Sequence, residues 1–231
     1  MSTIPQPSPK SFTPCIPLQW SLADLQERLG EIPPERVRLS PPLGCATEDD
    51  VLRVEEEGRY CELDYGVLVE KARGWYESVL AALLIGKLTS WLETNPLGMI
   101  TGEGGQLKIM PGVVKIPDVA FIRWSRFPQA PLPRRPIPAL VPDLAVEILS
   151  ETNTLSEMDR KRERYFESGV RMVWYIDPAT RTATSYPQAD QPVAMGADGF
   201  LDGGDVLPGF RLSLAELFAR ADQRGPESQG V

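Results

Sequence analysis

The sequence predicts an α/β or α+β fold in which helices flank a mixed β-sheet. Residues 75–95 contain no proline and are long enough for five helical turns, which predicts one long helix. Residues 143–150 form a nearly continuous apolar run with a single carboxylate, which is typical of a central strand buried on both faces. Short apolar runs separated by Gly and Pro alternate irregularly with helical segments around these two elements, and this irregular order favours a mixed sheet.

The composition narrows the class of protein further. The 231 residues suit one domain with appendages, and 42% hydrophobic with 24% charged residues is ordinary for a globular chain. The chain has no histidine, which excludes His-based triads and His-rich zinc sites. Cys15, Cys45 and Cys61 lie far apart and form no disulfide framework, so we expect a cytoplasmic protein. No uncharged apolar run reaches the length of a membrane helix.

The N-terminal quarter is expected to lie outside the main domain. Residues 1–19 are polar and rich in proline, and we interpret them as a flexible leader. Residues 20–58 are interpreted as a helical accessory arm with two helices. Ser21 with Asp24, and Thr47 with Asp50, have the spacing of helix N-terminal capping boxes.

The main domain is expected over residues 59–220, followed by a disordered tail over residues 221–231. A glycine between two apolar runs predicts a hairpin at its start. The other expected elements are the long helix, strands within 99–124, a proline-rich loop at 126–142, the buried strand, an amphipathic helix at 155–168, strands at 170–178 and 182–187, and a final strand and helix before residue 220.

Four ionisable residues lie within or beside segments that are expected to be buried and apolar. Glu77 shares a helical stripe with leucines, although a carboxylate near a helix start is also favoured by the helix dipole. Asp118 follows a proline and precedes an apolar run. It is either a functional residue or an ordinary turn aspartate at the edge of a strand. Glu147 interrupts the buried strand and needs a partner, which a structural cation would also satisfy. Lys161 lies on the flank of its helix and either reaches Glu147 or extends to solvent.

Taken together, these residues indicate metal-dependent phosphodiester chemistry. Carboxylates from two neighbouring strands, a third from a helix and a nearby lysine supply oxygen ligands that suit Mg²⁺ or Mn²⁺. A bound metal offsets local acidic charge, which matters because the formal net charge of −8 opposes binding to nucleic acid. The same pattern is open to a non-catalytic interpretation, in which the charges are structural.

The chain also resembles a known family along most of its length. The runs that carry the resemblance are CELDYGVLVEK, GWYES, IPDVAFI, PDLAVEILSETNT, GVRMVWYIDP and LDGGDVLPGF. In order and spacing they are similar to the Uma family of the PD-(D/E)xK nuclease superfamily. The resemblance implies a restriction-endonuclease-like core with Mg²⁺ or Mn²⁺ bound at carboxylates.

Carried over by position, the resemblance assigns roles to five residues. Asp118 is the motif aspartate, Glu147 is the acidic residue of the E-x-K element, and Glu62 matches a glutamate of the first hairpin. Glu77 matches a helix position where many relatives carry histidine. The superfamily lysine is expected two residues after Glu147, where this chain has a leucine, so the resemblance implies that Lys161 supplies it from the following helix.

We therefore expect an endonuclease that hydrolyses nucleic-acid phosphodiester bonds. Asp118, Glu147 and Glu62 would bind the metal, Glu77 would assist them, and Lys161 would activate water or stabilise the transition state. DNA is the expected substrate, bound weakly, with Arg134 and Arg135 of the basic loop contacting phosphates. A homodimer is expected by analogy, because cutting two strands suits two sites. The alternatives are a binding or assembly protein with the same fold, and a metal-dependent hydrolase of a small phosphate compound.

Overall fold

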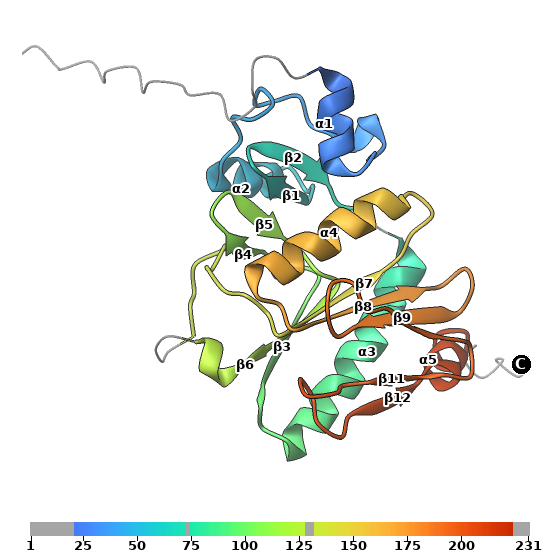
Figure 1. Cartoon of the computed structure of the whole chain (residues 1–231). Helices are drawn as coiled ribbons and strands as arrows, with labels where there is room; N and C mark the ends of the chain where they lie inside the picture. Colours follow the sequence, from blue (N-terminus) through green and yellow to red (C-terminus); the bar gives the residue numbers. More distant parts are fainter. Residues whose placement is uncertain (1–20, 73, 128–131, 224–231) are drawn as a thin grey trace, which may run out of the picture.

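The computed structural model describes residues 21–72, 74–127 and 132–223. The two larger of the three β-sheets in the described residues lie one above the other with a helix between them, and further helices cover their outer faces (Figure 1). The expected leader over residues 1–19 lies outside the described residues, as does the chain beyond residue 223. The mixed α and β architecture predicted from the sequence is confirmed.

The larger sheet has six strands and contains the buried strand predicted from the sequence. Its order is β10-β9-β8-β7-β6-β3, and it is mixed because β7 and β8 run parallel whereas the other neighbours are antiparallel. The strands are β3 (Gly98–Gly102), β6 (Val119–Arg123), β7 (Leu144–Ile148), β8 (Met172–Asp177), β9 (Thr182–Tyr186) and β10 (Val193–Met195).

The long helix α3 (Trp75–Thr94) covers one face of this sheet together with α5 (Leu214–Ala221) and the small β11–β12 sheet (Phe200–Asp202 and Arg211–Ser213). Leu80, Leu84 and Leu88 of α3 are fully buried, as the leucine stripe predicts. They join the same apolar core as Leu144, Val146 and Ile148 of β7. Because side chains alternate along a strand, Glu147 points to the opposite face. None of the described helices combines the length and apolarity that crossing a membrane requires.

The smaller sheet has four strands in the order β2-β1-β5-β4, and the sequence did not predict it as a separate sheet. Its strands are β1 (Cys61–Asp64), β2 (Val67–Glu70), β4 (Leu107–Met110) and β5 (Val113–Lys115). The hairpin between β1 and β2 closes with Tyr65 and Gly66, both with positive φ (44° and 84°), as a two-residue hairpin turn requires. The predicted hairpin is therefore present, and it belongs to the smaller sheet.

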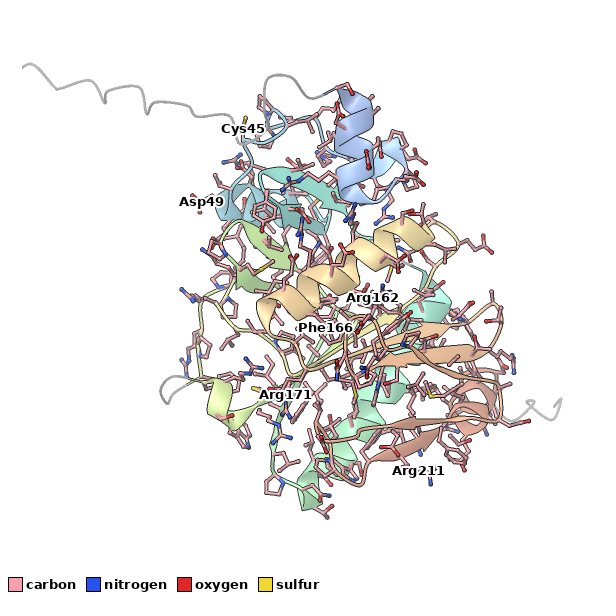
Figure 2. The ribbon with its side chains drawn as sticks, in the orientation of Figure 1. Cys45, Asp49, Arg162, Phe166, Arg171 and Arg211 are labelled. Carbon is pink, nitrogen blue, oxygen red and sulfur yellow. The ribbon has the colours of Figure 1, made fainter. Side chains whose placement is uncertain are left out.

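Helix α4 (Leu155–Ser168) lies between the two sheets and contacts both. It covers the residues predicted from the sequence, with Thr154 as its N-cap and Gly169 as its C-cap. Arg162 and Phe166 lie on its lower side in Figure 2. The Arg162 guanidinium is 4.5 Å from the centre of the Tyr186 ring of β9. The opposite side of α4 faces the smaller sheet and the N-terminal helices. Residues 116–118 join β5 of the smaller sheet to β6 of the larger sheet.

The N-terminal elements are α1 (Leu22–Leu29), the 3-10 turn η1 (Pro34–Arg36) and α2 (Glu48–Glu56). Both predicted capping boxes are formed. Helix α2 packs on the smaller sheet, and α1 packs beside β2 and the start of α4. Gly30 allows this close approach: it has a φ of +83°, and a Cβ there would lie 2.5 Å from the Ser156 carbonyl oxygen.

Candidate active site

Six buried ionisable side chains form one cluster between the smaller sheet, α4 and the C-terminal end of β7. We call it the ionic cluster. Each of the surrounding elements contributes to it, so the cluster depends on the packing of the whole domain. Its members are the carboxylates Glu62, Asp118 and Glu147 and the ammonium groups Lys71, Lys115 and Lys161.

Glu147 and Lys161 form the centre of the ionic cluster. The Lys161 Nζ lies 2.8 Å from the Glu147 Oε2, and both side chains are less than 10% exposed. One turn further along α4, the Tyr165 hydroxyl donates a hydrogen bond of 2.5 Å to the Glu147 Oε1. Both carboxylate oxygens are therefore held from a single face of α4, because residues four apart lie one above the other on a helix.

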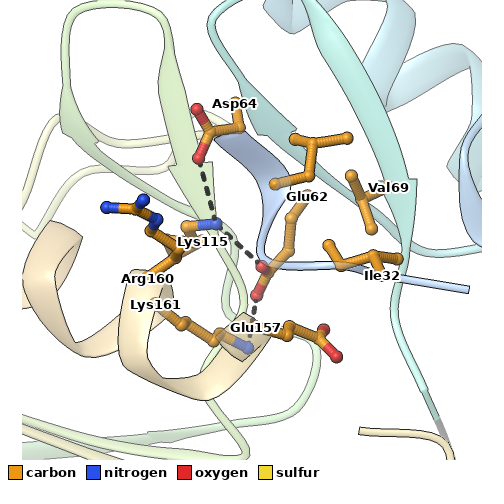
Figure 3. A pocket seen from close by; sticks show the side chains of 9 residues that line it. Ile32, Glu62, Asp64, Val69, Lys115, Glu157, Arg160 and Lys161 are labelled. Carbon is orange, nitrogen blue, oxygen red and sulfur yellow. Dashed lines mark hydrogen bonds and ion pairs between the residues drawn. The ribbon is translucent and has the colours of Figure 1, made fainter. Parts of the chain in front are cut away.

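Glu62 lies in β1 and contacts Lys161, the lysine that also pairs with Glu147. Its Oε1 is 2.8 Å from the Lys161 Nζ and accepts a 3.1 Å hydrogen bond from the Ile116 backbone N–H. Its Oε2 is 3.1 Å from the Lys115 Nζ at the end of β5. Figure 3 shows Glu62 between these two ammonium groups, with Ile32 and Val69 beside it.

Asp118 lies where the chain crosses from the smaller to the larger sheet, at the bend that its proline predicts. Its Oδ2 accepts a 2.6 Å hydrogen bond from the Ile148 backbone N–H, which fixes it beside the end of β7. Its Oδ1 is 2.7 Å from the Lys71 Nζ, and the same ammonium donates to the Ile116 carbonyl oxygen at 2.5 Å. Asp118, Glu147 and Lys161 line one small cavity.

The charges within the cluster determine the protonation of Lys161. Burial opposes its charged form, but Glu147 and Glu62 outweigh burial and raise the pKa of Lys161 above its ordinary value. Burial likewise opposes ionisation of Glu62, yet Lys115 and Lys161 hold its pKa well below the usual range. Lys161 is therefore a fixed cation between two carboxylates, which suits charge stabilisation and not proton abstraction.

Glu147 shows the opposite tendency from Glu62. Its pKa is raised, first by burial and then by the neighbouring Asp118, although Lys161 acts against both. Burial and the Glu147 carboxylate also raise the pKa of Tyr165 well above its ordinary value, so that its hydroxyl remains a hydrogen-bond donor. An additional cation beside Glu147 would oppose both effects and favour its ionised form.

Leu29, Ile32 and Arg36 of the N-terminal segment lie over one side of the ionic cluster, and we call these residues the cover. Arg36 of η1 lines the same cavity as Asp118 and forms two hydrogen bonds, of 2.8 and 2.9 Å, to the Glu157 carboxylate of α4. It also donates to the Glu70 carbonyl oxygen at 2.9 Å. Leu29 and Ile32 line the adjoining cavity beside Glu62. The cover thus ties α4 to β2 across the cluster.

The donor atoms of the cavity fit a hard divalent cation. Mg²⁺ and Mn²⁺ commonly bind one or two carboxylates and complete their coordination with water and phosphate oxygens. Asp118 and Glu147 supply two carboxylates, and the Ile116 carbonyl oxygen lies within reach of the same Lys71 ammonium that contacts Asp118. Within the part of the chain that the structure describes, no three acidic, cysteine or histidine side chains form a three-ligand metal site. Glu62 is instead engaged by two lysines.

The remaining predicted site residues lie elsewhere. Glu77 lies at the first turn of α3, which covers the sheet face opposite Glu147, and its carboxylate lies over the helix N-cap Gly74. It lines neither cavity of the ionic cluster. Arg134 and Arg135 are exposed in the loop before β7, and no described contact joins them to the cluster.

The sequence interpretation missed Lys71, Lys115 and Tyr165. Lys71 directly follows a strand and Lys115 ends one, so neither interrupts an apolar stripe that would have marked it as buried. A signal was present for Tyr165, which lies four residues after Lys161 and therefore on the same side of α4.

Comparison with known proteins places the chain among nuclease-like folds. The Uma2 family, described as "Putative restriction endonuclease", matches residues 48–215, a span that begins inside the expected arm and contains the whole ionic cluster. Among solved structures, the chain is similar to "a putative nuclease belonging to DUF820" from Anabaena variabilis. That pair shares 21% identity with a TM-score of 0.66, covering 76% of this chain and 99% of the other. No match is found among curated proteins.

Proposed function

The chain belongs to the Uma2 family, and from that premise we propose that it is a metal-dependent nuclease that hydrolyses phosphodiester bonds in nucleic acid. One observation carries the proposal. A buried ammonium, Lys161, is shared by Glu147 and Glu62 beside Asp118, in a cavity with two carboxylates that suit Mg²⁺ or Mn²⁺. When bound, the metal would lower the pKa of a water molecule and neutralise charge on the phosphate.

The side chains of the site divide into two groups in this proposal. Asp118 and Glu147 hold the metal, each oriented by a fixed donor, the Ile148 N–H and the Tyr165 hydroxyl respectively. Lys161 presents a permanent positive charge to the phosphate in the transition state. Glu62 acts as a positioning residue, because its carboxylate holds Lys161 in place and keeps it protonated.

The test is cleavage of supercoiled DNA, linear duplex, single-stranded DNA and RNA, with and without Mn²⁺. We expect Mn²⁺-dependent cleavage of at least one of these substrates. Glu147→Gln keeps the size of the side chain and its hydrogen bond from Tyr165, and we expect it to reduce cleavage by roughly 10²-fold or more. Glu77→Gln is the matched control, since Glu77 lies outside the cavity. Equal losses in both variants would contradict the assignment of Glu147.

A non-catalytic function is the second candidate, and a specific observation favours it. Every oxygen of Asp118, Glu147 and Glu62 already has an ammonium, hydroxyl or backbone N–H partner, so the cluster is a complete structural network without any ligand. A protein with this function would bind nucleic acid or a partner without cleaving it. Hydrolysis of a simple phosphate diester, with no cleavage of any nucleic acid, would instead favour a small phosphate compound as substrate.

A further inference from the structure

The charges that surround Asp118 carry an inference that rests on the proposed function. We propose that the Lys71 ammonium occupies the cation position of the site in the free protein, so that a divalent metal binds strongly only together with a phosphate of the substrate. Lys71 would then couple metal binding to substrate binding.

The contacts of Lys71 are those of a bound cation. Its ammonium lies 2.7 Å from the Asp118 Oδ1 and 2.5 Å from the Ile116 carbonyl oxygen, and both atoms are oxygen donors of the kind that Mg²⁺ and Mn²⁺ use. The side chain is only 5% exposed, so the ammonium is committed to these oxygens and not to water. A metal bound at this edge of Asp118 must displace it.

The backbone next to Lys71 holds the ammonium at this position. Lys71 follows the last residue of β2, and its N–H donates a 2.9 Å hydrogen bond to the Tyr60 carbonyl oxygen just before β1. The root of the side chain is therefore fixed by the hairpin, and the ammonium stands at the end of a flexible four-carbon stem. In this proposal the ammonium leaves Asp118 by a change of side-chain rotamer.

The balance of charge explains why metal and phosphate should enter together. The ionic cluster pairs three carboxylates with three ammonium groups, and Lys115 also lies 3.8 Å from Asp64. A divalent cation that displaces the Lys71 ammonium replaces one positive charge with two, and the extra charge is costly in a buried site. One negative charge arrives with a phosphate diester. Departure of the Lys71 ammonium removes a positive charge, and these two changes together compensate the metal.

The first experiment measures Mn²⁺ binding to the wild-type chain by calorimetry, with and without a short phosphorothioate oligonucleotide. We expect the oligonucleotide to tighten Mn²⁺ binding roughly tenfold, and Mn²⁺ to tighten oligonucleotide binding by the same factor, because coupling between sites is reciprocal. A methylphosphonate oligonucleotide of the same sequence lacks the charges and should have no such effect. Mn²⁺ binding that is equally tight in all three conditions would overturn the proposal.

The second experiment removes the resident cation. Lys71→Met should tighten Mn²⁺ binding roughly tenfold in the absence of oligonucleotide and abolish most of the coupling. Lys115→Met is the matched control, because Lys115 is similarly buried and also pairs with a carboxylate but does not contact Asp118. An equal gain in both variants would show that total charge, and not occupation of the Asp118 oxygen, sets the affinity.

The outcomes separate this proposal from the proposed function. If Lys71→Met does not fold, the coupling measured on the wild-type chain still decides. If no Mn²⁺ binds under any condition and no nucleic acid is cleaved, the proposed function is wrong. If the wild-type chain cleaves nucleic acid but binds Mn²⁺ independently of the oligonucleotide, the function stands and the role of Lys71 is wrong.

Discussion

On one face of the six-stranded sheet, Val146 and Ile148 of β7 pack against α3 in an entirely apolar core, whereas on the other face Glu147 of the same strand meets Lys161 and Tyr165 of α4. Both faces are buried to a similar degree, so the difference between them is one of chemistry and not of solvent access. The apolar face gains free energy from burial alone.

The second face gains free energy only if every charge is matched, because an unmatched buried charge costs more than the pair contributes. The identity of each side chain on this face therefore depends on the charge of its partners, whereas the apolar face requires only hydrophobic side chains of suitable size. The apolar face stabilises the strand, and the opposite face holds the residues to which the proposed function is assigned.

The largest stability effect is expected on the apolar face. Leu84→Ala removes a fully buried side chain beneath the sheet and should lower the free energy of unfolding by about 3 kcal/mol, measured by urea denaturation. Leu83→Ala is the control on the same helix, where the side chain is only partly buried, and its cost should be clearly smaller. Equal costs would mean that α3 does not pack as described.

A comparable loss is expected when one charge is removed from the ionic face. Lys161→Met leaves Glu147 and Glu62 without their shared cation and should lower the free energy of unfolding at pH 7 by about 3 kcal/mol. Adding Glu147→Gln to this variant should restore much of the loss, since one of the uncompensated carboxylates is gone. Two independent, additive losses would show that the residues are not coupled.

A smaller effect concerns pH. The pKa of Glu147 is raised in the folded state, so its contribution to stability is present below the unfolded pKa, near 4.3, and is lost as the pH rises through the folded pKa. Glu147→Gln should therefore gain stability relative to the wild type as the pH rises from 4 to 7.

Glu62 provides the opposite sign in the same experiment. Its pKa is lowered, so its contribution is present above the unfolded pKa and is lost as the pH falls. Glu62→Gln should lose stability relative to the wild type over the same interval. Thermal melting across the pH range measures both, and parallel curves for the two variants would contradict the described sharing of Lys161.

The smallest stability effect is expected outside both faces. Arg134 and Arg135 are exposed, and replacing both with alanine should leave the unfolding transition unchanged. If the loop contacts phosphates, the double variant should bind DNA more weakly, with a salt dependence that is flatter by one to two phosphate contacts, measured by fluorescence anisotropy. An unchanged salt dependence would place the nucleic-acid surface elsewhere.

The two faces also differed in how well the sequence predicted them. The leucine stripe of α3 follows directly from helical periodicity, and Glu147 was identified because it interrupts an apolar strand. The position of Lys161 on the flank of its helix predicted that it could reach Glu147, and the 2.8 Å contact agrees with that expectation.

The other residues of the site could not be predicted, because their positions depend on how segments distant in the sequence pack together, and local sequence patterns do not encode this packing. Lys71 and Lys115 enter the cluster because β1, β2 and β5 form a second sheet over α4, and no local pattern in the sequence indicates that this sheet is a separate layer. The Arg36 contact across the cluster comes from the expected accessory arm over residues 20–58, for which the sequence predicted no role at the site. The metal-binding and catalytic roles stay predictions.

The place of Lys161 on a helix also affects how related chains can be recognised. A lysine on the same strand as its glutamate must keep a fixed spacing of two residues, because the pleat dictates which side chains share a face. Here the Thr154 cap sets the start of α4, and the loop over residues 149–154 absorbs the separation from Glu147. A text pattern with fixed spacing will overlook chains built in this way, whereas a search for a strand carboxylate facing a helical lysine and tyrosine four residues apart will find them.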